Sequence, residues 1–165
     1  MSEETVEVFK AAIKHAESIA PLFDAYRVFY GKSSDIPLAE AFLRERLSND
    51  ECVIFICRML SSPVPTGFAQ LYPLFSSVCA RRIWLLNDLF VSSDFRRLGV
   101  ARRLLQAVHE HARETGAIEV VLSTAHTNAS AQALYQSFGY VRDTEFRTYR
   151  FVPCPNEQVL STSAS

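Results

Sequence analysis

Four arginines surround one glycine at a point where an apolar segment passes into a helical pattern. Arg96, Arg97, Arg102 and Arg103 supply the charge, and Gly99 stands between the two pairs. The first turn of a helix presents unpaired backbone N–H groups and a partial positive charge, and a glycine there lets an anion approach. Together these features suit a ligand with several phosphate charges. The same pattern also occurs in tight turns beside a solvated helix face.

Hydrophobic periodicity predicts the elements that position this turn. Alternating or β-branched segments indicate strands, and apolar residues at spacings of three and four indicate helices. Pro21 marks a kink or an early turn in the first helix, and Gly116 ends the third. The expected order is a strand over 5–11, helices over 13–31 and 33–47, a meander of strands over 52–60, 67–75 and 81–91, a helix ending at Gly116, a strand over 117–124, a helix over 128–139 and a strand or hairpin over 140–152.

The strands ending at Val91 and covering 117–124 flank one helix, which makes a β-α-β unit with parallel strands and a right-handed crossover. Ligands of α/β sheets gather at the carboxyl ends of such strands. The arginine-rich turn follows the first of these strands directly. We therefore expect the functional site of the protein to lie at this turn.

Neither a Walker loop nor a three-glycine dinucleotide loop occurs here. The segment Arg96 to Ala101 instead resembles the R/Q-x-x-G-x-G/A loop of the GNAT acetyltransferase superfamily, whose backbone amides hold the pyrophosphate of acetyl-coenzyme A. A later helix resembles that family's N-x-x-A-x-x-L-Y-x-x-x-G-F/Y motif. The matching residues are Asn128, Ala131, Leu134, Tyr135, Gly139 and Tyr140.

The resemblance covers about residues 5 to 152, because the element order also agrees. It implies an α/β (α+β) fold of the GNAT acyl-CoA N-acyltransferase type, with a mixed central sheet of six to seven strands flanked by about four helices. Residues 1–152 then form a single acetyltransferase domain, and residues 153–165 a flexible tail.

Within the superfamily, residues 67–96 are most similar to the spermidine/spermine and thialysine acetyltransferase branch. That branch typically has Leu-Glu-Asp before the apolar triplet, whereas this chain has Leu86, Asn87 and Asp88. Asn87 replaces the glutamate associated with handling the amine, so polyamine specificity is not carried over.

The resemblance implies direct acetyl transfer from acetyl-CoA to an amine. A lysine-like amine, with a pKa near 10.4, must lose a proton, at a cost of about 4.6 kcal/mol at pH 7. Asp88 is the candidate general base, and it is equally read as a carboxylate that fixes a strand irregularity. Asn87 cannot take a proton and could only orient the amine or a water molecule.

By the same resemblance, a backbone N–H of Leu89, Phe90 or Val91 stabilises the oxyanion, and the strand binds the pantetheine arm. Tyr135 matches the family's acid for the leaving thiolate, although it also fits an apolar helix stripe. Asn128 caps its helix and contacts coenzyme A. The cofactor-binding residues expected are Leu89, Phe90, Val91, Arg96, Arg97, Leu98, Gly99, Val100, Ala101, Arg102, Asn128 and Tyr135.

Composition restricts the classes of partner. The 165 residues are 48% hydrophobic and 21% charged, with a net charge of −1, which gives no general attraction to nucleic acid or anionic lipid. Apolar segments are too short to span a membrane and the start lacks a secretory pattern, so we expect a cytoplasmic protein. The histidines and four cysteines lack ligand spacing, which predicts no metal and predicts buried reduced thiols.

Two other functions compete with catalysis: a coenzyme A sensor, which Asn87 would allow, and a nucleic-acid module that uses the arginines, which the net charge disfavours. For an enzyme, the expected acceptor is a small primary amine or amino-acid-like compound, and a protein lysine or N-terminus comes second. The family resemblance also allows a homodimer. Aromatic residues that border the acceptor cleft in the family, or pack in the core, are Phe23, Tyr26, Tyr30, Tyr72 and Phe75.

Overall fold

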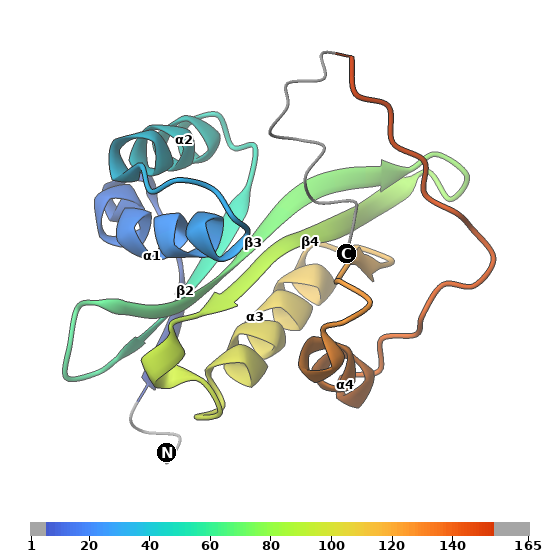
Figure 1. Cartoon of the computed structure of the whole chain (residues 1–165). Coiled ribbons are helices and arrows are strands. Elements are labelled where there is room, and N and C mark those ends of the chain that lie inside the picture. Colours follow the sequence, from blue (N-terminus) through green and yellow to red (C-terminus); the bar gives the residue numbers. More distant parts are fainter. Residues whose placement is uncertain (1–5, 154–165) are drawn as a thin grey trace. The chain divides into compact units, whose positions relative to one another are not determined.

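The structure is a computed structural model that describes residues 6–153 (Figure 1). The chain divides into two compact units, residues 1–125 and residues 126–165. Each unit is described by itself below. The predicted tail lies outside the described residues, apart from Pro153.

The first unit is built on one sheet whose strands follow one another in chain order. The first four strands pair antiparallel and confirm the predicted meander, while the fifth runs parallel to the fourth, as the β-α-β unit requires. The strands are β1 (Val6–Lys10), β2 (Val53–Met59), β3 (Pro65–Ser76), β4 (Arg81–Val91) and β5 (Val120–Val121).

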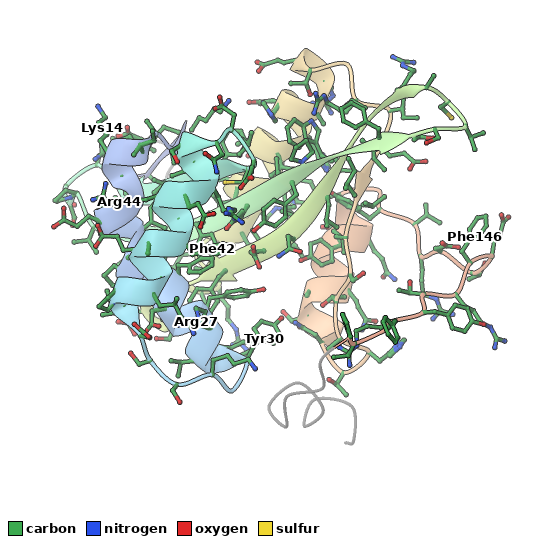
Figure 2. All side chains as sticks on the ribbon, turned by 90° about the horizontal axis from the view of Figure 1, so that it is seen from above. Lys14, Arg27, Tyr30, Phe42, Arg44 and Phe146 are labelled. Atoms are coloured by element: carbon green, nitrogen blue, oxygen red, sulfur yellow. The ribbon has the colours of Figure 1, made fainter. Side chains whose placement is uncertain are left out.

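Helices α1 (Ala16–Phe29) and α2 (Ile36–Ser48) cover one face of the sheet (Figure 1). The side chain of Asp35 accepts a hydrogen bond from the Leu38 N–H, which caps α2 as its sequence predicts. Phe42 points from α2 toward the sheet, and Arg44 points away (Figure 2). The ring of Phe42 stacks on Phe23 of α1, with centroids 5.6 Å apart, in the main hydrophobic core.

Helix α3 (Val100–Glu114) packs on the opposite face of the sheet (Figure 1). Its apolar stripe, predicted from the sequence, is buried at Leu104, Leu105, Val108 and Ala112, and Val100 at the helix start is buried as well. Gly116 follows the helix with a φ of +65°, in the left-handed conformation usual for a residue just past a helix end.

The second unit contains α4 (Ala129–Ser137), which makes four α-helices in the described part of the chain, as predicted. Asn128 is its N-cap, since the side-chain oxygen accepts a 3.1 Å hydrogen bond from the Ala131 N–H.

The sheet has five strands among the described residues, and not the six to seven expected. Residues 140–152 alternate like a strand but contain none. One reason is local: the Asp143 carboxylate accepts hydrogen bonds from the N–H groups of Glu145 and Phe146, at 2.8 and 3.1 Å. These turn bonds compete with a strand ladder for the same donors.

The strand expected over 117–124 is also shorter than predicted, because only Val120 and Val121 pair with β4. The ladder ends where β4 carries an irregularity beyond Leu85. A bulge bends its strand away from a neighbour, so the parallel pairing stops there.

Two of the four cysteines expected to be buried, Cys52 and Cys57, are buried, but Cys79 is exposed in the turn between β3 and β4, so that part of the prediction was wrong. Cys154 lies outside the described residues. Hairpin turns lie at the surface, where no core covers them.

Candidate active site

A β-bulge in β4 falls at Asn87, directly before Asp88. Leu71 of β3 lies opposite Leu86, whereas Gln70 lies opposite Asp88, so β4 contains one residue more than its partner. That extra residue is Asn87. Bulges re-aim side chains and are frequent beside active sites.

The bulge changes the face to which the following side chains point. The indole ring of Trp84 lies 4.9 Å from the His111 ring of α3, whereas the Phe90 ring lies 5.7 Å from Tyr26 of α1. Residues six apart share a face in a regular strand. Here they occupy opposite faces, and Asp88 accordingly meets α1.

Asp88 is 5% exposed and its carboxylate has two side-chain donors. The amide of Asn87 donates to it at 3.0 Å, and the Tyr26 hydroxyl also hydrogen-bonds to it. Burial raises the pKa of Asp88 above its ordinary value, and the bonds from Tyr26 and Asn87 oppose that rise. A buried carboxylate with a raised pKa is a stronger base than an exposed one.

Sequence reasoning missed Gln70, which is completely buried opposite Asp88. Its amide donates to the Tyr72 hydroxyl at 2.8 Å, while its Oε1 atom has no partner among the described residues. Burial raises the pKa of Tyr72 to about 12 and that of neighbouring Cys52 to about 11. A glutamine within the apolar segment 67–75 is the signal that could have revealed this cluster.

Beyond Leu85, β4 presents an edge that no strand within residues 6–125 pairs on the β5 side. The Ser92 N–H donates to the Thr66 carbonyl of the adjacent strand. Because bonding alternates along an antiparallel pair, the backbone groups of Phe90 face β3, and those of Leu89 and Val91 face the open edge. Of the three expected oxyanion donors, Leu89 and Val91 therefore have the suitable direction.

The arginine-rich loop has two residues in the left-handed conformation. Arg97 has a φ of +62° and Gly99 a φ of +82°. A non-glycine residue rarely adopts this conformation, and successive N–H groups in such turns form concavities that bind anions. A Cβ atom added at Gly99 would meet no atom within 4 Å, so the space beside the glycine is open.

The start of α3 lies directly behind this loop. Its N-cap is Gly99, which has no side chain for capping, and no acidic residue occurs in its first turn. The buried Val100 side chain lies against Gly67 of β3. Val100 therefore anchors the start of α3 against β3.

Arg96 also has a role within the fold. Its Nε atom donates to the Val91 carbonyl at 3.1 Å, and its guanidinium lies 5.8 Å from the ring centroids of both Phe29 and Phe90. Arg97, Leu98 and Arg102 are exposed beside it. The loop thus combines one arginine attached to β4 with exposed cationic neighbours.

The two remaining predicted site residues lie in the second unit. Asn128 caps α4, and the Tyr135 ring contacts Tyr140 edge to face, with centroids 5.7 Å apart. The two units hold separate parts of the predicted residue set, and Asn87, Asp88 and the Gly99 loop all belong to the first.

Residues 6–153 bear on two further expectations, which concern a metal site and a membrane-spanning helix. These residues contain no cluster of three or more histidine, cysteine or acidic side chains able to hold a metal ion. Over the same range, every helix is too short or too polar to cross a lipid bilayer.

Comparison with known proteins places the chain among acetyltransferases. The sequence profile of the acetyltransferase (GNAT) family matches residues 19–140. The uncharacterized N-acetyltransferase YhfO of Bacillus subtilis (strain 168) is 45% identical over 144 residues, which cover 87% of this chain and 95% of the relative. The thialysine N-epsilon-acetyltransferase of Caenorhabditis elegans is 26% identical over 139 residues, which cover 84% and 85% of the two chains.

A crystal structure of a probable acetyltransferase matches with a TM-score of 0.86 and 39% identity, covering 91% of this chain and 99% of the other. The family match spans most of the chain, including the bulge, the Gly99 loop and α4. The protein therefore belongs to the GNAT family and is an acetyltransferase.

Proposed function

We propose that the protein transfers an acetyl group from acetyl-CoA to a primary amine by direct attack in a ternary complex. The observation that supports this most is the open edge of β4, which lies between the Asn87 bulge and the Gly99 loop. A cosubstrate with a charged diphosphate and an extended amide-containing arm needs an anion site next to unpaired strand backbone.

The hydrogen-bond donors and cationic side chains of this region fit such a cosubstrate. The first-turn N–H groups of α3 and the exposed Arg97 and Arg102 would hold the diphosphate. The edge groups of Leu89 and the N–H of Val91 would pair with the amides of the arm, since the Val91 carbonyl already accepts a hydrogen bond from Arg96. Asn128 of the second unit would contribute a further contact, as the family motif implies.

Acetyl-CoA supplies a thioester carbonyl that an uncharged amine can attack. Asp88 takes the proton that the amine must lose, directly or through water, and Asn87 orients the amine or that water. The backbone N–H of Leu89 or Val91 donates to the carbonyl oxygen as it gains negative charge. Tyr135 gives a proton to the departing thiolate and regains one from the nitrogen of the tetrahedral intermediate, after which the new amide and the free thiol leave.

The acceptor we propose is a small primary amine or an amino-acid-like compound. The related thialysine acetyltransferase carries the name of such an acceptor. A protein lysine or N-terminus is the second candidate. Asn87 stands where a glutamate is usual, which argues against a polyamine because a neutral amide gives a second ammonium group no charge partner.

Calorimetric titration with coenzyme A and an assay of thiol release with a panel of amines test this proposal. We expect saturable binding, and acetyl-CoA-dependent thiol release with at least one amino-acid-like amine. Tight binding without turnover for every amine would favour the coenzyme A sensor. Turnover only with peptides would favour a protein acceptor, and the absence of binding would contradict the proposal.

A further inference from the structure

The Asp88 carboxylate accepts a hydrogen bond from Tyr26 of α1, whose ring is packed on several sides. The Tyr26 ring lies 5.9 Å from Phe68, 5.7 Å from Phe90 and 6.2 Å from Phe23, measured between centroids. Each of these rings belongs to the main core. A ring packed in this way has little freedom to move its hydroxyl group.

The bulge brings Asp88 to this hydroxyl. Without the bulge, regular alternation of β4 through Asn87 would leave Asp88 on the face of Trp84, toward α3. With it, Asp88 shares the face of Phe90 and accepts a hydrogen bond from Tyr26. We propose that Tyr26 is a positioning residue, whose phenol hydroxyl holds the Asp88 carboxylate in the orientation from which it receives the proton of the acceptor amine.

This inference rests on the proposed function, because it assigns Tyr26 a role through the general base. The other titratable groups around Asp88 differ from Tyr26 in their contacts or their charge. Tyr72 and Cys52 also lie near the carboxylate, and both stay uncharged at neutral pH because burial raises their pKa values. The nearest cation of α2, Arg46, interacts with Cys52 and Tyr72 and forms ion pairs with Glu45 and Glu51.

The test compares the pH dependence of kcat/KM for the wild type and Y26F. Loss of the donor removes a bond that favours the ionised carboxylate, so the pKa of Asp88 rises further. We expect the acid limb of the profile to move up by about one pH unit, with roughly a tenfold loss of rate below it and little change on the plateau. Carbon-13 NMR titration of the Asp88 carboxyl should report the same shift without any turnover.

Y72F is the matched control. It removes a phenol hydroxyl from the same cluster, but that hydroxyl is bonded to Gln70 and not to Asp88. We expect lower thermal stability with an unmoved acid limb. Equal profiles for Y26F and wild type, with an unchanged NMR titration, would overturn the inference. A wild type that acetylates no amine would refute the proposed function, while the NMR shift alone would still decide whether Tyr26 controls Asp88.

Discussion

Asp88 gains its chemical character from its surroundings. It is 5% exposed, and burial raises its pKa although two side chains donate to it. The two readings allowed by the sequence, a general base and a carboxylate that fixes the bulge, predict different consequences for the same substitution.

We predict that D88N lowers kcat/KM by roughly 10²- to 10⁴-fold, the usual contribution of general base catalysis. The amide has nearly the same shape but cannot take the proton. Coenzyme A affinity, measured by calorimetry, should stay as in wild type, because Asp88 lies away from the Gly99 loop in sequence and on the α1 face. Full activity with a clearly lower melting temperature would support the purely structural role.

At the scale of elements, the cosubstrate loop depends on how β3, β4 and α3 meet. Gly99 begins α3 with a left-handed backbone, and Gly67 lets the start of that helix approach β3 closely. The two glycines have different structural roles, so substitution of each should affect a different measurable property.

We predict that G99A weakens coenzyme A binding at least about tenfold while it costs about 1–2 kcal/mol of stability. The strain comes from the φ of +82°, since a Cβ there meets no atom of the protein. The added methyl group would instead meet the bound diphosphate.

G116A is the control for this variant, because Gly116 has a φ of +65° and equally open surroundings at the other end of α3. It should lose a similar amount of stability in urea denaturation, with unchanged coenzyme A affinity. Equal affinity of G99A and G116A would contradict the proposed diphosphate site.

At Gly67 we predict overpacking. A Cβ atom would lie 2.9 Å from Val100 Cγ1, 3.0 Å from the Phe90 carbonyl oxygen and 3.2 Å from Leu104 Cδ1. G67A should therefore cost about 1–3 kcal/mol in the free energy of unfolding. Urea denaturation of G67A, V100A and the double variant should show coupling, because removal of Cγ1 relieves one of the close contacts. Strictly additive costs would show that α3 is not pressed against this glycine.

Features of the fold that depend on residues close together in the sequence could be predicted from the sequence. The Asn128 cap, the end of α3 at Gly116 and the meander were all predicted correctly. The bulge could not be read in the same way, because an extra residue is defined only against a partner strand. Gln70 and the short β5 follow from that same pairing.

At the scale of the whole molecule, three histidines lower the free energy of unfolding as the pH falls. Burial lowers the pKa values of His15, His109 and His111 below the ordinary 6.5. Below pH 6.5 the unfolded chain binds protons that the folded chain does not, so the free energy of unfolding falls as the pH falls. The raised pKa of Asp88 acts oppositely, since the folded state then takes up a proton before the unfolded state does.

His111 allows a direct measurement. Its ring lies 4.9 Å from Trp84 and 5.6 Å from Phe55, and its Nε2 atom is buried without a partner among residues 6–153. H111F keeps aromatic packing and removes the titrating group, so we predict a smaller drop in melting temperature between pH 7.5 and about pH 5.5 than in wild type. Parallel melting curves for both proteins would show that His111 does not contribute.

Substitution and deletion of Asn87, the inserted residue of β4, should have different consequences. The pairing with β3 sets the direction of Asp88 and Phe90, and the bulge accommodates Asn87 without changing that pairing, so the exposed Asn87 side chain carries little of the packing. Substitution at this position can therefore alter which amine is accepted while the sheet stays intact. Deletion would close the bulge, because Leu86 and Asp88 already pair with adjacent residues of β3, and it would leave Asp88 on the same face without the Asn87 amide beside it.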